Sequence, residues 1–290
     1  MKPVLKAAIW MTGAIASFST MAVAGREVSF ALDTFEIMLF RSVVGVIIVV
    51  FAAIAFGTLR QINRQQFSLH FARNIMHFIG QNLWFYAVTV IPLAQVFALE
   101  FTSPIWVILL SPLLLGERIT LIRAAAALMG FIGILVVTRP NMAGINTGVI
   151  MAASSAIFFA FTIIFTKRLT RTQSITCILF YLTVLQLGFG LITAGHDGDI
   201  ALPNTETLPW LVLIGVAGLL GHFCITKALE IAPATVVVPI DFVRLPVIAI
   251  IGMLAYGEIL DLWVLLGSGI IFASNYLNIL SETRGSSTLE

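Results

Sequence analysis

The chain has 290 residues, of which 59% are hydrophobic and only 10% are charged, and its formal net charge is +2. An ordinary soluble domain carries about 25% charged residues, and a soluble core of this length cannot cover so much apolar surface. The composition therefore excludes a water-soluble enzyme and a disordered chain, and the small charge argues against a nucleic-acid partner. Most of the chain must lie in lipid, so the bilayer is its first predicted partner.

Ten apolar stretches follow one another, each long enough to cross a bilayer, which takes about 20 residues. They cover residues 4–24, 34–56, 69–89, 93–115, 120–138, 147–166, 174–194, 209–229, 233–256 and 262–281. The first has no small-residue cleavage site before a polar mature protein, so we interpret it as a span and not as a removed signal peptide. The sequence predicts an all-α polytopic membrane protein with ten transmembrane helices.

Lys and Arg residues of the short loops gather on one side of this topology. With a cytoplasmic N-terminus, the inner side holds eleven of them and the outer side holds two, Arg26 and Arg139. Positive residues are retained in cytoplasmic loops. The pattern therefore predicts cytoplasmic N- and C-termini, in what we expect to be a bacterial inner (plasma) membrane.

The chain repeats itself at an offset of 140 to 141 residues. The matched positions are residues 37–40 with 177–180, Gly80 with Gly221, Gln81 with His222, Pro92 with Pro233, Glu100 with Asp241, and 116–117 with 257–258. Each half holds five spans, an odd number, so the second half must enter the membrane upside down. Inverted repeats of this kind place a site at their interface near the midplane. The predicted boundaries are 1–140 and 141–281 for the two five-helix repeats and 282–290 for a polar tail.

Two matching segments carry a family resemblance. The first segment runs from residues 91–94 through 101–104 to 115–118. The second segment runs from residues 231–234 through 241–242 to 256–258. Together with the ten spans, they resemble the drug/metabolite transporter superfamily and, within it, the EamA family. The resemblance covers the whole chain and implies secondary transport or export of small metabolites such as amino acids, without ATP. It says almost nothing about which substrate is carried.

Four ionisable residues stand out inside the spans, where each charge costs about 2.5–3.5 kcal/mol on insertion scales. They are Arg41, Glu100, Asp241 and Arg244. Asp241 and Arg244 are three residues apart and share a helix face. They form either a fixed ion pair or a switchable pair that opens for a charged substrate or a proton. Pro239 and Pro246 flank them and predict a kink in this span.

Glu100 has no basic residue three positions later, so its partner must come from another helix. Arg41 is the best candidate by depth, which makes a structural Arg41–Glu100 bridge one interpretation. The alternative is that Arg41 grips a substrate carboxylate, which a planar guanidinium does well, while Glu100 faces a substrate amine. Because buried acids bind protons more readily, Glu100 and Asp241 are the candidates for a coupling proton.

The third span carries a polar stripe at helical spacing. It consists of Arg73, His77, Gln81 and Trp84. Arg73 lies near the cytoplasmic end, so its side chain is expected to extend to the interface. In the eighth span, His222 is the repeat counterpart of Gln81, and Thr226 follows four residues later. These stripes either line the transport pathway or hydrogen-bond between helices.

Other polar residues have structural interpretations. Lys227 and Glu230 are predicted to form an interfacial ion pair. Glu117 and Glu258 each follow a glycine at the end of a fourth helix, where they cap the following helix or form part of a gate, and we favour capping. Both cysteines lie in apolar runs without metal-ligand spacing, which predicts free thiols in the core.

The leading hypothesis is a secondary transporter that moves a small-molecule substrate by alternating access. Both signs of charge favour an amino acid, a related zwitterion or a small carboxylate, and a carrier of S-adenosylmethionine or a nucleoside-like molecule is the alternative. A channel is disfavoured because the charges are few and mixed. An enzyme is disfavoured because no nucleophile–base set or HExxH motif occurs. The predicted substrate-binding residues are Arg41, His77, Gln81, Trp84, Glu100, His222, Asp241 and Arg244.

No cofactor and no metal are expected, because the sequence contains no Gly-rich phosphate loop and no metal-ligand spacing. The sequence leaves open the direction of transport, the coupling ion, and whether the protein works as a monomer or a homodimer.

Overall fold

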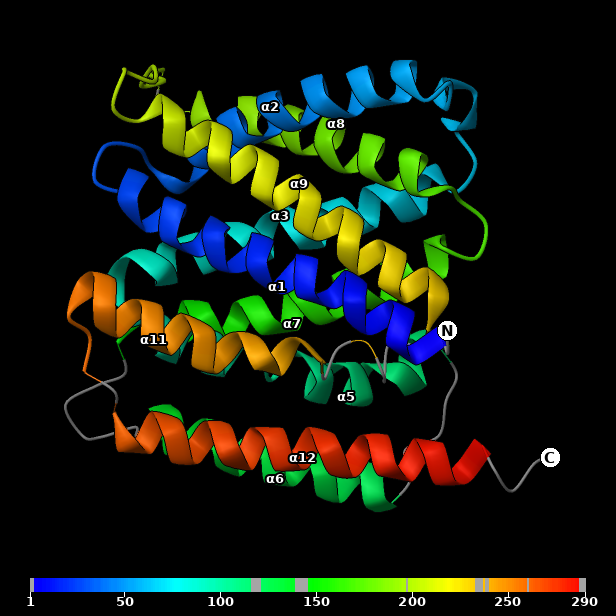
Figure 1. The fold of residues 1–290 in the computed structure, drawn as a ribbon, viewed down its shortest axis with the longest axis vertical. Coiled ribbons are helices and arrows are strands. Elements are labelled where there is room, and N and C mark those ends of the chain that lie inside the picture. The colour runs from blue at the N-terminus through cyan, green and yellow to red at the C-terminus, as the bar shows by residue number, and fades with distance from the viewer. Residues whose placement is uncertain are drawn as a thin grey trace.

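The computed structural model of the protein describes residues 3–115, 121–138, 146–196, 198–232, 237, 240–259 and 261–286. All regular secondary structure in these ranges is helical, as Figure 1 shows. The first half contains α1 (Pro3–Val28), α2 (Thr34–Ala55), η1 (Leu59–Gln61), α3 (Phe67–Val90), α4 (Leu93–Glu100), α5 (Ser103–Leu115) and α6 (Leu121–Thr138). The second half contains α7 (Thr147–Leu169), α8 (Ile175–Ala194), α9 (Leu208–Ile231), η2 (Asp241–Val243), α11 (Arg244–Tyr256) and α12 (Leu262–Ser286). The predicted all-α fold is confirmed.

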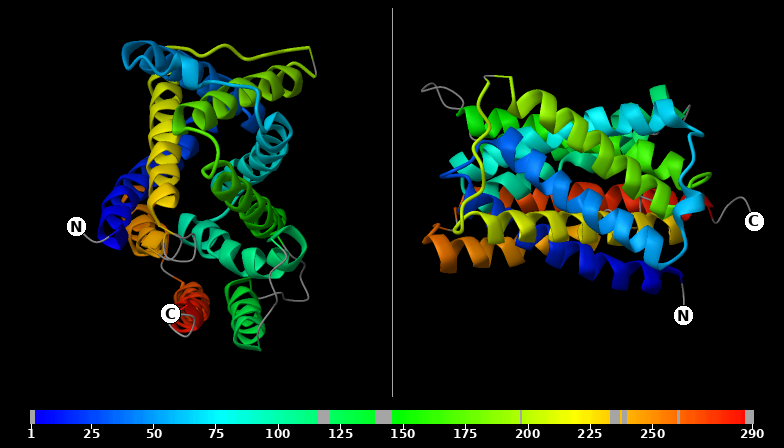
Figure 2. Two further views of the ribbon diagram at one scale, coloured as in Figure 1. Left: turned by 90° about the vertical axis from the view of Figure 1, so that its right-hand side faces the viewer. Right: turned by 90° about the horizontal axis from the view of Figure 1, so that it is seen from above.

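The helices run alongside one another as one bundle (Figure 1). By length and composition, five of those described can cross a membrane: Leu5–Val28, Thr34–Ala55, Thr147–Leu169, Ile175–Ala194 and Leu208–Ile231. In α3 the polar stripe lowers the hydropathy. Four further apolar helical segments among the described residues are shorter: Leu93–Val107, Ala127–Val137, Arg244–Tyr256 and Leu262–Ser274. Because α1 begins and α12 ends at the same end of the bundle, we call that end the termini face and the other the opposite face (Figures 1 and 2).

Two of the predicted spans are discontinuous, and both break at the aligned acids. The span at 93–115 consists of α4 and α5, and α4 ends at Glu100. In the span at 233–256, Asp241 opens the short η2, and α11 begins three residues later. Pro246 lies in the first turn of α11, where the missing N–H removes no helix hydrogen bond. The predicted irregularity near Asp241 is confirmed, while Pro239 lies outside the described residues.

The helix packing has the symmetry of an inverted repeat. Helix α1 packs on α9, and its repeat counterpart α7 packs on α3, the counterpart of α9. The remaining main pairs join a helix to its own counterpart, α2 to α8 and α6 to α12. The view along the helices shows the α2–α8 pair and the α6–α12 pair at opposite ends of the cross-section (Figure 2, left). The central region therefore lies between α1, α3, α7 and α9.

Aligned glycines permit the close contacts at the centre. A Cβ atom on Gly80 of α3 would lie 3.1 Å from Cδ1 of Phe159, and one on Gly221 of α9 would lie 2.5 Å from Cε1 of Phe18. Phe18 and Phe159 are themselves 141 positions apart, as the two glycines are. Small residues let membrane helices approach closely. The same contact is therefore made twice, once between α3 and α7 and once between α9 and α1.

Candidate functional site

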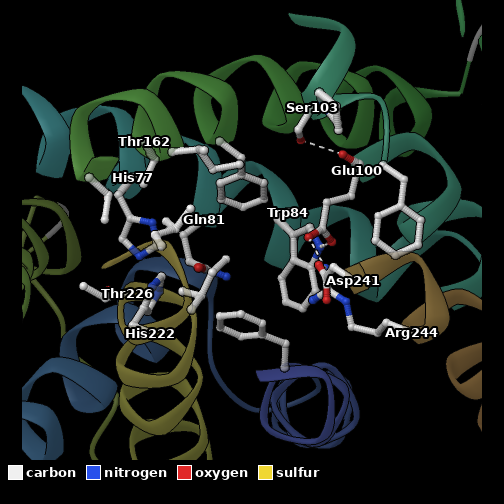
Figure 3. Close-up of a pocket in the computed structure, with 18 of the residues that line it drawn as sticks. His77, Gln81, Trp84, Glu100, Ser103, Thr162, His222, Thr226, Asp241 and Arg244 are labelled. Carbon is white, nitrogen blue, oxygen red and sulfur yellow. Dashed lines mark hydrogen bonds and ion pairs between the residues drawn. The ribbon is translucent and has the colours of Figure 1, made fainter. Parts of the chain in front are cut away.

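A cavity of about 880 Å³, its open mouth included, lies between the two repeats. Helices α1, α3, α7 and α9 contribute to its walls, together with the broken segments around Glu100 and Asp241. The residues predicted from sequence that line it are His77, Gln81, Trp84, Glu100, His222, Asp241 and Arg244 (Figure 3).

One end of the cavity is charged. Arg244 donates one hydrogen bond to Glu100, with 2.6 Å between Nη2 and Oε1, and one to Asp241, with 2.7 Å between Nη2 and Oδ2. The indole N–H of Trp84 donates to the other carboxylate oxygen of Glu100 at 2.7 Å. The predicted contact between Asp241 and Arg244 is confirmed. Because all of these groups are largely buried, the hydrogen bonds offset the cost of holding charges in the membrane.

Of the two interpretations of Arg41, the structural bridge to Glu100 is not formed, because Glu100 pairs with Arg244 and Trp84. Helix α2 packs mainly on α8 and α9, so Arg41 meets α9 and not α4. Its guanidinium lies against Gly218, where an added Cβ would be 2.8 Å from Nε, and Nη1 lies 3.5 Å from Sδ of Met38. No carboxylate of the described residues pairs with it, and it lines a small separate pocket. Depth in the membrane therefore did not identify which helices are neighbours.

Arg73 also differs from expectation. Its side chain does not extend to the interface, because only 1% of the residue is exposed. Nε donates to Oγ1 of Thr166 at 3.1 Å, and Nη1 donates to Oδ1 of Asn74 at 3.0 Å. Arg73 lines the cavity at the end nearer the termini face. Its position one turn from His77 on a shared helix face is the sequence signal that identifies it as a lining residue.

The histidines lie at this same end of the cavity. The rings of His77 and His222 meet edge to face, with 4.6 Å between centroids. In the described part of the chain, neither ring nitrogen of His77 has a hydrogen-bond partner, and Nε2 of His222 and Oγ1 of Thr226 also lack one. Buried polar atoms in proteins almost always have partners. This wall therefore presents polar groups that a water or a ligand can satisfy (Figure 3).

Aromatic side chains form the wall between the two polar ends. Phe18, Trp84, Phe101 and Phe159 line the cavity. Rings of this kind pack against the faces of other rings and against apolar surface. The cavity thus combines an acidic end that also holds an arginine, an aromatic middle and an end with Arg73 and two histidines.

Comparison with known proteins identifies the family. The EamA-like transporter family matches the chain twice, over residues 5–139 and 146–280. The chain belongs to this family. It is therefore a secondary transporter of small metabolites, an integral membrane protein with multiple spans and two EamA repeats, and not an enzyme.

Relatives of this EamA transporter share nearly its whole length. A riboflavin transporter of Vibrio cholerae serotype O1 is 30% identical over 287 residues, which cover 97% of this chain and 95% of the relative. An S-adenosylmethionine uptake transporter of Rickettsia conorii is 25% identical over 275 residues, covering 95% and 92%. A crystal structure with a TM-score of 0.67 covers 96% of this chain and 98% of its own at 18% identity, a likeness that shows the fold alone.

Other residues singled out in the sequence lie outside the lining of the cavity. Lys227 and Glu230 form the predicted ion pair, with 2.8 Å between Nζ and Oε2, and both side chains are exposed. Both cysteines are free and buried, as expected. Glu258 does not cap the following helix. It accepts hydrogen bonds from the backbone N–H of Leu93, at the start of α4, and pairs with Arg26. Glu117 lies outside the described residues.

Proposed function

We propose that this transporter carries a metabolite with an aromatic ring system between two polar ends, and that it works by alternating access of the central cavity. The observation that supports this most directly is the arrangement of that cavity. Aromatic side chains form its middle, and charged or unpaired polar groups form both ends. The site is assembled from both repeats at the breaks of two aligned helices, which is the arrangement of many alternating-access carriers.

Two classes of substrate suit these walls. Riboflavin is the first candidate, because its flat ring system matches the aromatic middle and its ribityl chain offers hydroxyls to the histidine end. The whole-length likeness to a riboflavin transporter supports it. S-adenosylmethionine is the second candidate. The end of the cavity with Glu100, Asp241 and Arg244 has one net negative charge, and the other end holds the positive charge of Arg73. A zwitterion with a cationic centre fits that polarity, and an aromatic amino acid belongs to the same class.

Binding and transport can be tested with one preparation. Flavin fluorescence is quenched when the ring stacks on an indole, so riboflavin added to purified protein should lose fluorescence through Trp84. The Trp84→Phe variant keeps an aromatic ring and should bind with less quenching. Proteoliposomes should then take up labelled riboflavin with saturation. Saturable uptake of S-adenosylmethionine without riboflavin uptake would instead select the second candidate, and uptake of neither would remove the proposed substrate class.

Asp241 is the better of the two candidates for a coupling proton. Both oxygens of Glu100 are engaged, one by Arg244 and one by Trp84. Oδ1 of Asp241 is buried and has no hydrogen-bond partner among the described residues. With riboflavin, which is uncharged, an Asp241→Asn variant should keep substrate exchange and lose accumulation driven by a pH gradient. Unchanged pH-driven accumulation in this variant would remove the proton-coupling role.

We further propose that both termini are cytoplasmic in a bacterial inner membrane. The charge bias of the loops supports this orientation, and Lys167, Arg168 and Arg171 at the end of α7 lie on the termini face. Arg41 is left out of the proposed binding set, because it does not line the cavity. The boundaries at 140 and 281 remain predictions.

A further inference from the structure

An arginine at the opposite face of the bundle binds both repeats. Near the end of α1, Arg26 donates to two backbone carbonyls at the end of α3, from Nε to Val88 at 2.8 Å and from Nη2 to Ile91 at 2.6 Å. Its Nη1 pairs with Glu258, which follows α11 in the other repeat. Glu258 also accepts from the N–H of Leu93 at 3.0 Å. One side chain thus ties α1 and α3 to the end of α11.

Lys167 makes the equivalent contacts at the termini face. Near the end of α7, its Nζ donates to the carbonyl oxygen of Leu229 at 2.6 Å and to that of Ala232 at 3.2 Å, at the end of α9. Each of these three residues lies 141 positions after its counterpart at the opposite face: Lys167 after Arg26, Leu229 after Val88 and Ala232 after Ile91. The inverted repeat has therefore built the same basic contact at both faces of the membrane.

The sequence explains why these carbonyls are free to bind a base. In a helix, the carbonyl of residue 88 would accept from the N–H of residue 92, and that of residue 229 from residue 233. Both of these residues are prolines, Pro92 and Pro233, which have no N–H. The last carbonyls of a helix need outside donors. A cationic side chain supplies them and also matches the negative end of the helix dipole.

A glycine directs the acid of the contact toward Arg26. Helix α11 ends at Tyr256, and Gly257 adopts the left-handed conformation with φ of 63°. Glycine adopts this conformation without the steric cost that other residues incur. The chain therefore reverses at Gly257, and Glu258 turns back toward the start of α4. The ring of Tyr256 lies below the guanidinium of Arg26, 5.0 Å from its Cζ.

The cavity extends further toward the termini face than toward the opposite face. Toward the termini face its lining reaches Thr166 and Leu229, close to the ends of α7 at Leu169 and α9 at Ile231. Toward the opposite face, the lining of α3 stops at Trp84, although that helix continues to Val90.

We propose that Arg26 and Glu258 form the latch that holds the opposite end of the transport cavity shut, and that Lys167 is its repeat-related counterpart at the termini end. The proposal rests on the alternating access of the proposed function. Opening the opposite end requires Arg26 and Glu258 to separate, because they belong to different repeats. The contacts of each base with its own repeat can persist during that movement.

The test measures from which face the cavity can be reached. In full-length protein with Cys177→Ser and Cys224→Ser, a Thr162→Cys reporter places one thiol in the cavity wall. A membrane-impermeant maleimide is applied to vesicles of each orientation, which a C-terminal tag identifies. The parent protein should be labelled mainly from the termini face. A charge-assisted hydrogen bond is strong enough to shift a two-state population by roughly tenfold, so Glu258→Gln should raise labelling from the opposite face by about that factor.

Matched variants make the result specific. Glu230→Gln removes a carboxylate from an exposed pair outside the latch and should leave labelling unchanged. Arg26→Lys keeps the charge but cannot reach every partner, so it should raise opposite-face labelling by less than Glu258→Gln does. Lys167→Gln should leave opposite-face labelling low. Unchanged labelling in both Glu258→Gln and Arg26→Lys would overturn the latch, as would an equal rise in Lys167→Gln.

Labelling needs no substrate, so the latch and the proposed function are tested separately. If Glu258→Gln exposes the cavity although no ring-bearing metabolite is transported, the proposed substrate falls and the latch stands. If a substrate is transported and labelling never changes, only the latch is overturned.

Discussion

Replacing Arg244 with methionine should strongly destabilise the protein, because a single guanidinium nitrogen serves two buried carboxylates. The side chain of Arg244 is 4% exposed, and those of Glu100 and Asp241 are 14% and 13% exposed. Each hydrogen bond to a charged group contributes about 1.5–3 kcal/mol, and two are lost. Removing one partner of a buried ion pair costs about 3–5 kcal/mol, since the remaining charge is left without compensation. We therefore expect a loss of about 3–5 kcal/mol in the free energy of unfolding.

A triple variant separates this effect from loss of packing. Arg244→Met combined with Glu100→Gln and Asp241→Asn removes all three charges and keeps the side-chain volumes similar. Replacing a whole buried ion cluster is often close to neutral, so the triple variant should regain most of the lost stability. The measurement is denaturant unfolding of the purified proteins in detergent micelles. A single variant as stable as the parent, or a triple variant as unstable as the single one, would refute the reasoning.

Three further predictions follow from the packing and the charges. Gly221→Val should lower the free energy of unfolding by about 1–3 kcal/mol, because the new side chain meets Phe18. Gly188→Ala is the control and should not lower it, because a Cβ at this position meets nothing within 4 Å. Thermal unfolding measures both variants. Arg73→Gln should weaken the binding of S-adenosylmethionine roughly tenfold, which is about 1.4 kcal/mol. It should weaken the binding of riboflavin less, because only S-adenosylmethionine carries a carboxylate. Titration calorimetry measures both affinities. Lys227→Gln should cost less than about 1 kcal/mol in denaturant unfolding, because the pair with Glu230 is exposed.

The fold was largely predictable because lipid imposes strong rules on sequence. Apolar length located the spans, and the repeat offset placed Glu100 and Asp241 in equivalent positions. Both helices break there, and the three-residue spacing of Asp241 and Arg244 predicted their contact. These properties are local or periodic, so they can be read along the chain.

Contacts between helices were harder to predict, because they depend on which helices are neighbours. Arg41 has the depth of Glu100, but α9 lies beside it and α4 does not. Arg73 lies near a helix end, where extension to the interface is common, yet its face turns to Thr166 inside the bundle. The contacts of Arg26 and Lys167 had a usable signal, since each base is aligned by the repeat and each accepting helix ends before a proline. To use this signal, one must know that α1 ends beside the end of α3 and that α7 ends beside the end of α9.

Counterflow in proteoliposomes tests the central claim most directly, that a ring-bearing metabolite moves through the cavity by alternating access. Vesicles preloaded with unlabelled riboflavin are diluted into a trace of labelled riboflavin, and internal label is followed over time. A carrier predicts a transient accumulation of label above its external concentration. Equilibration without that overshoot would contradict the carrier account, and the absence of counterflow with riboflavin, S-adenosylmethionine and aromatic amino acids alike would contradict the assignment of the cavity as the substrate site.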